Sequence, residues 1–210
     1  MTLIIKTYIL GPLQNNTYLL ADDSAGRAVI VDPSFGSEII LNEIKQNGWV
    51  LDALWCTHAH FDHTAGIPAL LEAGMDASIG LHALDLPLWQ RGGGAGDFGI
   101  TFPDLPAPDL EFTHGQMLKV GLHTVEVRHT PGHTPGHVVF HLSGSRLLLC
   151  GDLIFYHSVG RTDLPGGDSR TLTASIRGQV FTLPPDTRLL SGHGPESHVA
   201  EEQACNPYLY

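Results

Sequence analysis

Residues 57–63 (Thr-His-Ala-His-Phe-Asp-His) constrain this chain most, because they hold three histidines and an aspartate in six consecutive positions. A short apolar run, typical of a buried strand, precedes them. If the chain stays extended beyond that strand, side chains two positions apart share a side, so His58 and His60 should face together. Asp62 and His63 then turn away from that pair. The pattern predicts two neighbouring metal sites, one fed by each pair.

Three later segments can supply the ligands that two such sites still need. Each places a histidine or an aspartate after an apolar strand, beside glycines that let the backbone approach closely: His133, Asp152 and His193. Ligands at several strand ends can converge on one rim of a packed sheet structure. Imidazole nitrogens and carboxylate oxygens without thiolate suit zinc, iron or manganese better than a closed, cysteine-bound structural zinc.

With these residues in this order, the chain resembles the metallo-β-lactamase fold superfamily. The resemblance rests on the motif His58-x-His60-x-Asp62-His63, followed by His133, Asp152 and His193. Two further strings, residues 11–18 (Gly-Pro-Leu-Gln-Asn-Asn-Thr-Tyr) and 160–168 (Gly-Arg-Thr-Asp-Leu-Pro-Gly-Gly-Asp), are similar to the short, single-domain glyoxalase II-like branch, whose members are hydroxyacylglutathione hydrolase-like. The resemblance runs from about Gly11 to Leu209.

This resemblance implies an α/β fold of four layers, the αβ/βα sandwich. Two mostly antiparallel sheets should lie face to face, with helices on both outer faces and the metals at one edge. Residues 1–210 are expected to form one domain, without a separate C-terminal helical domain for glutathione. The residues alone predict a layered α/β structure and leave its topology open.

The resemblance also implies two divalent metal ions, with zinc favoured and iron or manganese as alternatives. The first ion would be bound by His58, His60 and His133, the second by Asp62, His63 and His193, with Asp152 bridging them. Hydroxide held by the metals would attack the carbonyl carbon of an acyl thioester, S-lactoylglutathione or a related hydroxyacyl thioester. Asp62 and Asp152 are the expected catalytic residues, acting with that hydroxide, and Arg161 is a candidate contact for the substrate.

Two other functions stay open at this point. One is a mononuclear iron oxidoreductase similar to the persulfide dioxygenases, which would use His58, His133 and Asp152. The other is a metal-binding module without catalysis, which ranks last because no ligand of the motif is missing. The strings around His133 and Arg161 favour the hydrolase.

Several polar residues are expected to lie outside the ligand set. His137 is predicted to support the site rather than to bind metal. Asp32 is either the partner of a ligand histidine or an aspartate of a turn, and the sequence leaves both interpretations open. Asp163 is predicted to brace the loop that carries Arg161. The remaining histidines, His157 among them, are predicted to be ordinary polar or surface residues.

The net charge of the chain bears on the kinds of partner that it can bind. The 22 Asp and Glu residues against 11 Lys and Arg give a net charge of −11, which disfavours nucleic acid and leaves a small-molecule thioester as the expected partner. No apolar run reaches the roughly 20 residues of a membrane span. The three cysteines are too few for a disulfide framework, so a cytoplasmic location is expected. Cys56 and Cys150 are predicted to be buried, and Cys205 to be exposed.

Prolines and glycines determine the structure expected for two segments near the predicted site. A helix is expected from about Thr64 to Ala73, because Pro68 is tolerated in a first turn. Residues 91–110 contain three consecutive glycines and three prolines with little periodicity. A loop of that length is either a functional lid or a mobile connection.

Overall fold

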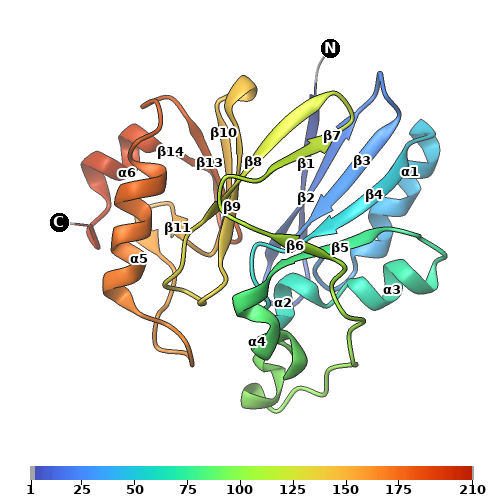
Figure 1. Ribbon diagram of the computed structural model, residues 1–210, viewed down its shortest axis with the longest axis horizontal. Coiled ribbons are helices and arrows are strands. Elements are labelled where there is room, and N and C mark those ends of the chain that lie inside the picture. The colour runs from blue at the N-terminus through green and yellow to red at the C-terminus, as the bar shows by residue number, and fades with distance from the viewer. Residues whose placement is uncertain (1–2, 210) are drawn as a thin grey trace.

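Two six-stranded sheets lie face to face in the computed structural model, which describes residues 3–209 (Figure 1). The first sheet contains, in spatial order, β1 (Leu3–Leu10), β2 (Asn15–Asp22), β3 (Arg27–Val31), β4 (Val50–Trp55), β5 (Ser78–His82) and β6 (Leu110–Phe112). Strands β1 to β3 pair antiparallel, whereas β3 to β6 pair parallel. The expectation of a mostly antiparallel sheet is therefore wrong here. Helical crossovers separate the last four strands, and such crossovers are what parallel neighbours require.

The second sheet is mostly antiparallel, as expected. It contains, in spatial order, β14 (Ser197–His198), β13 (Arg188–Ser191), β10 (Leu147–Gly151), β9 (Val138–Leu142), β8 (His123–His129) and β7 (Met117–Val120). Its one parallel pairing joins β10 to β13. A short turn, η4 (Ser143–Ser145), closes the β9–β10 hairpin, and β11 (Ile154–Phe155) with β12 (Ser158–Val159) forms a separate small hairpin.

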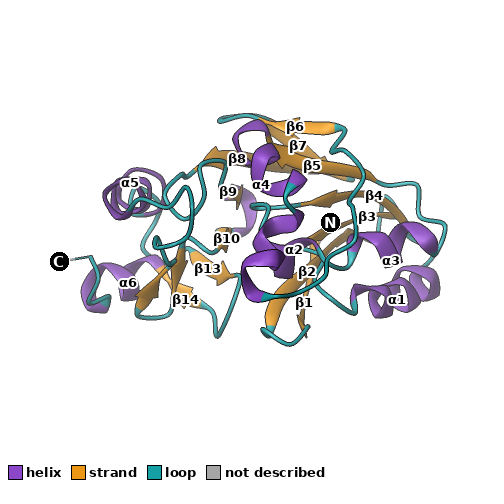
Figure 2. Cartoon of the chain, turned by 90° about the horizontal axis from the view of Figure 1, so that it is seen from below, coloured by secondary structure: helices purple, strands orange, loops and turns teal. Residues whose placement is uncertain are grey.

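Helices cover both outer faces, so the four-layer αβ/βα arrangement is confirmed (Figure 2). The helices before β6 are η1 (Ser37–Ile39), α1 (Ile40–Asn47), α2 (Phe61–Thr64), α3 (Ile67–Glu72), η2 (Ala83–Asp85), α4 (Leu86–Gln90) and η3 (Gly92–Phe98). Those after β10 are α5 (Ser169–Ser175), the π-helical turn η5 (Ile176–Val180) and α6 (Val199–Cys205). Within residues 3–209, none of these helices is long and apolar enough to cross a lipid bilayer.

Three apolar clusters hold the layers together. The central one lies between the sheets and joins β2, β3 and β4 to β8, β9 and β10. The other two pack α1, α3 and α4 on the first sheet, and α5, η5 and α6 on the second. Strands β2, β9 and β10 are buried at every residue because both of their faces are covered. Each fully buried large aliphatic side chain contributes about 1.5–3 kcal/mol to this packing.

The helix expected from about Thr64 to Ala73 is present as α3, but it begins three residues later than expected, and the short helix α2 precedes it. α2 ends at Thr64, and α3 begins only at Ile67. The break follows from Gly66, whose backbone packs on the 33–34 turn: its N–H donates to the Pro33 carbonyl, and a Cβ there would lie 2.2 Å from the Ser34 carbonyl oxygen. Only glycine fits so close an approach.

Residues 91–110 are less irregular than the sequence indicates. Their first part forms η3, which packs against the histidine-rich loop. The contact is so close that a Cβ on Gly93 would lie 2.4 Å from the Phe61 nitrogen. Residues 99–109 then run without regular structure to β6. The Trp89 indole holds this stretch by donating to the Pro106 carbonyl at 3.1 Å.

Candidate metal centre

The seven predicted ligands converge at one edge of the sandwich. They come from the loop after β4, from α2, from the loop before β9, and from the ends of β10 and β13. Three groups have ligand atoms within 4.8 Å of one another: His58, His60 and His133; Asp62, His63 and His193; and His58, His63 and Asp152. Asp152 lies between the first two groups, with Oδ1 3.3 Å from His63 Nε2 and Oδ2 3.6 Å from His133 Nε2.

Three of these histidines are oriented by hydrogen bonds from their Nδ1 atoms to oxygen acceptors. His133 Nδ1 donates to the Arg161 carbonyl at 2.8 Å, and His193 Nδ1 donates to the Leu13 carbonyl at 3.0 Å. His63 Nδ1 donates to Asp32 Oδ2 at 3.0 Å. Each bond places a ring proton on Nδ1 and turns Nε2 towards the centre. Metal-binding histidines are commonly oriented in this way.

Asp32 organises two ligands at once. Besides His63, its carboxylate accepts the Thr57 N–H at 2.7 Å and the Thr57 hydroxyl at 2.8 Å. That hydroxyl can then accept from His58 Nδ1, 3.0 Å away. Of the two interpretations left open by the sequence, the histidine partner is therefore confirmed. Asp32 is buried and has a φ of 51°, a left-handed conformation that this network holds in place.

Atoms at the centre lack the hydrogen bonds that buried polar groups normally make. His58 Nε2, His63 Nε2 and Asp152 Oδ1 are buried without a hydrogen-bond partner in the described structure, and each such group costs about 1–3 kcal/mol. His60 Nδ1 and His133 Nε2 face each other at 2.9 Å. Inward-facing nitrogens and carboxylate oxygens without protein partners fit cations between them.

Burial lowers the pKa of His58 and favours a neutral ring there, whereas nearby carboxylates, Asp62 and Asp152 among them, outweigh burial and raise the pKa of His63 and of His193. Burial also lowers the pKa of His60 to about 3, with the neighbouring His133 adding to the effect. Burial opposes ionisation of Asp152 as well, but His63, His133 and His193 outweigh it and lower the pKa of that carboxyl. Metal binding requires neutral imidazole and ionised carboxylate, so an ion bound by His63 or His193 would displace a proton from that ring.

Two residues just outside the centre hold Asp152 in position. His137 Nε2 accepts the Asp152 backbone N–H at 3.1 Å, and its Nδ1 lies 2.9 Å from the Thr130 hydroxyl. His137 therefore has both nitrogens occupied, as its predicted supporting role requires. Gly192 packs against the carboxylate, and a Cβ there would lie 2.3 Å from Asp152 Oδ1.

Asp85, at the end of η2, is a residue of the site that the sequence did not indicate. Its fully buried carboxylate accepts the Ala59 N–H at 3.0 Å, the Thr134 hydroxyl at 2.8 Å and the Gly136 N–H at 2.6 Å. Burial raises the pKa of Asp85, and these three donors only partly offset that effect. One side chain thus ties the loop of His58 and His60 to the loop of His133.

A cavity of about 260 Å³ lies directly over the predicted ligands. Its apolar walls are Leu13, Phe61, Phe98 and Leu164, and Arg161 lies at its rim. Arg161 donates to both oxygens of Asp163 at 2.7 Å, so the predicted bracing contact is present. Since η3 supplies Phe98, part of the 91–110 segment borders this cavity.

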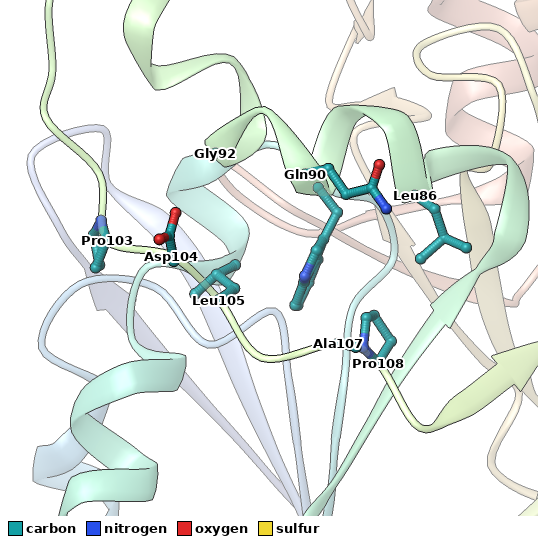
Figure 3. Close-up of a pocket in the computed structure, with 9 residues that line it drawn as sticks. Leu86, Gln90, Gly92, Pro103, Asp104, Leu105, Ala107 and Pro108 are labelled. Atoms are coloured by element: carbon teal, nitrogen blue, oxygen red, sulfur yellow. The ribbon is translucent and has the colours of Figure 1, made fainter.

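A second cavity, of about 250 Å³, lies between α4 and residues 103–108 (Figure 3). None of the seven predicted ligands lines it, and Asp104 is the single charged residue among its described lining. The cavity over the ligands is therefore the one that serves the metal centre.

Comparison with known proteins identifies the family. Residues 10–193 match the model of the metallo-beta-lactamase superfamily. The chain therefore belongs to that superfamily. The cluster of histidines and aspartates agrees with a metal-binding site of a hydrolase of this superfamily.

Two relatives of similar length carry hydrolase names. The probable metallo-hydrolase YqgX of Bacillus subtilis is 37% identical over 95% of this chain and 94% of its own. The hydroxyacylglutathione hydrolase GloC of Haemophilus influenzae is 33% identical over 93% of both chains.

Solved structures agree with the fold. BLEG-1 B3 metallo-beta-lactamase superposes with a TM-score of 0.90 and 34% identity over 98% of this chain and 99% of its own. TTHA1623 in a di-iron-bound form has a TM-score of 0.87 and 38% identity over 97% of this chain and 100% of its own.

Proposed function

We propose that this protein is a binuclear metal-dependent hydrolase of acyl thioesters, of the hydroxyacylglutathione type. The observation that carries the proposal is the convergence of seven possible ligand side chains, three of which turn buried atoms without a hydrogen-bond partner towards the centre. The 33% identity to a hydroxyacylglutathione hydrolase over 93% of the chain supports the choice of substrate class.

In this proposal two divalent ions occupy neighbouring positions. The first would be held by His58, His60 and His133, and the second by Asp62, His63 and His193, with Asp152 available to both. Imidazole and carboxylate suit zinc and iron alike, and the di-iron form of TTHA1623 supports two ions. When bound, such ions lower the pKa of water and polarise a carbonyl oxygen.

The chain's own residues then favour a leaving group that needs no proton. Asp62 is the nearest carboxyl to act as an acid, but its Oδ2 lies 3.3 Å from His193 Nε2 and 3.6 Å from His63 Nε2. As a metal ligand, Asp62 would be ionised and would carry no proton to donate. A thiolate leaves without protonation near neutral pH, whereas the amide nitrogen of a β-lactam requires it.

The experiment that tests this function compares three substrates on the metal-loaded protein. We expect release of thiol from S-lactoylglutathione at a kcat/KM at least about tenfold above that for cleavage of a β-lactam, a difference of about 1.4 kcal/mol in transition-state binding. We also expect no stoichiometric oxygen uptake with glutathione persulfide. Oxygen uptake without thioester cleavage would replace the hydrolase by an iron oxidoreductase.

The cavity predicts weak dependence on the glutathione moiety. Among its described lining residues Arg161 is the sole lysine or arginine, and Asp163 already pairs with that guanidinium. We therefore expect kcat/KM for a glutathione thioester to exceed that for the same acyl group on a truncated thiol by less than about tenfold. Arg161→Ala should reduce that preference only a few-fold, since exposed ion pairs contribute little.

Arg146→Ala provides the matched control, because Arg146 is also an exposed arginine paired with an aspartate, Asp186, and does not line the cavity. It should leave the preference unchanged. A preference of several powers of ten that disappears in Arg161→Ala alone would reveal a dedicated glutathione site and contradict the expectation.

A further inference from the structure

A second cluster of possible metal ligands, which shares no residue with the seven predicted ligands, lies where the β11–β12 hairpin meets α6. The hairpin contributes His157, and α6 contributes Glu201 and Cys205. One ligand atom from each lies within 4.8 Å of the other two. In Figure 1, β11 and α6 lie on the C-terminal side of the molecule, together with α5.

The hairpin residue is held in place before any ion binds. His157 has a φ of 53°, and its backbone N–H donates to the Glu202 carboxylate, with Oε2 3.1 Å away. Glu202 is buried and also accepts from Ser197 and from Asn206. The imidazole stacks on Tyr156 with ring centroids 4.0 Å apart. This arrangement fixes the imidazole over α6.

The helix presents the other two ligands on one face. Glu201 and Cys205 are four residues apart, so their side chains are neighbours along α6. Glu201 Oε1 already lies 2.6 Å from His157 Nε2. Cys205 is exposed, whereas Cys56 and Cys150 are buried. A thiol, an imidazole and a carboxylate at this spacing form a ligand set that suits zinc.

We propose that His157, Glu201 and Cys205 form a peripheral site for a thiophilic divalent ion of the zinc class. On binding, the Cys205 thiol loses its proton to solvent, a metal–sulfur bond forms, and nothing is oxidised or reduced. The His157–Glu201 hydrogen bond gives way to two bonds to the ion. With three protein ligands, the site keeps a position for water, so binding should be reversible.

This site would connect a segment of the catalytic edge to α6. The β11–β12 hairpin runs between Asp152, a predicted catalytic ligand, and Arg161 at the rim of the cavity. An ion shared by His157 and α6 would hold that hairpin in place. The proposal rests on the peripheral residues alone and does not depend on which reaction the catalytic edge performs.

The reactivity of Cys205 towards a chromogenic disulfide reagent tests the site directly. The protein is first loaded with metal at its catalytic centre, and zinc or magnesium is then added in excess. Because Cys56 and Cys150 are buried, one thiol per chain should react quickly. We expect zinc to slow that reaction at least tenfold and magnesium to leave it unchanged, since magnesium prefers oxygen ligands.

Variants of His157 and Glu201 test whether these residues cause the protection of Cys205 by zinc. His157→Asn, chosen because asparagine tolerates a positive φ, and Glu201→Gln should each abolish most of the protection by zinc. His198→Ala, which removes a nearby exposed histidine outside the cluster, should retain it. No slowing by zinc in the unmodified protein, or equal slowing in His157→Asn and Glu201→Gln, would overturn the proposal.

Discussion

Replacing Asp152 by alanine is expected to lower kcat/KM for thioester hydrolysis by more than about 100-fold, because even outer partners of metal ligands contribute about 10–100-fold. Its two oxygens face different groups, Oδ1 towards His63 and Oδ2 towards His133. Loss of the carboxylate should therefore weaken both ions together. Metal content after gel filtration, measured alongside steady-state kinetics, provides the test.

Two further variants separate the charge of Asp152 from its shape and provide a control carboxylate outside the ligand set. Asp152→Asn keeps the shape of the side chain but removes its charge, so it should also lose metal. Asp97→Ala removes an exposed carboxylate from the adjacent η3 and should retain both metal and activity. Loss of one ion alone in Asp152→Ala would contradict the bridging position of this carboxylate.

Replacing Asp85 by alanine is expected to have the second-largest effect. It leaves the Ala59 N–H, the Thr134 hydroxyl and the Gly136 N–H without their acceptor in a buried place. Each unsatisfied donor costs about 1–3 kcal/mol, so the free energy of unfolding of the metal-free protein should fall by several kcal/mol. Because the two ligand loops lose their link, metal affinity should also fall about 10–100-fold.

The control for Asp85→Ala is Asp109→Ala. Asp109 also accepts a backbone N–H, from Ile79 at 2.6 Å, but it lies outside the metal centre. Its loss should lower stability without changing metal affinity. If the alanine variant of Asp85 is too unstable to purify, Asp85→Asn retains one acceptor oxygen and should show an intermediate loss of affinity. Unchanged affinity in a folded Asp85 variant would show that the link has no role in the site.

The convergence of the seven residues was predictable because their order and spacing constrain where they can meet. In the segment 57–63, alternation along an extended chain pairs His58 with His60, and Asp62 and His63 then turn away. Glycines beside Asp152 and His193 indicate close backbone approach. The structure brings all seven to one edge, as these patterns predict. That they bind two ions in the proposed division stays a prediction.

Other features depend on contacts between distant segments and leave little trace in the sequence. Asp85 lies in a short helix 26 residues after Ala59, and its local pattern is that of any helix with a polar residue. The break at Gly66 follows from packing against residues 33–34, which no local preference indicates. Parallel pairing in the first sheet could have been inferred from the helices between β3, β4 and β5, but the family resemblance pointed to antiparallel sheets.

A metal titration of the metal-free protein, monitored by the rate of S-lactoylglutathione hydrolysis, distinguishes a binuclear from a mononuclear centre. Zinc and iron(II) are added in separate series, with the concentration of chain known. We expect activity to rise to a plateau at two catalytic equivalents per chain, in Cys205→Ser as in the unmodified protein. A plateau at one equivalent with full thioesterase activity would contradict the binuclear centre.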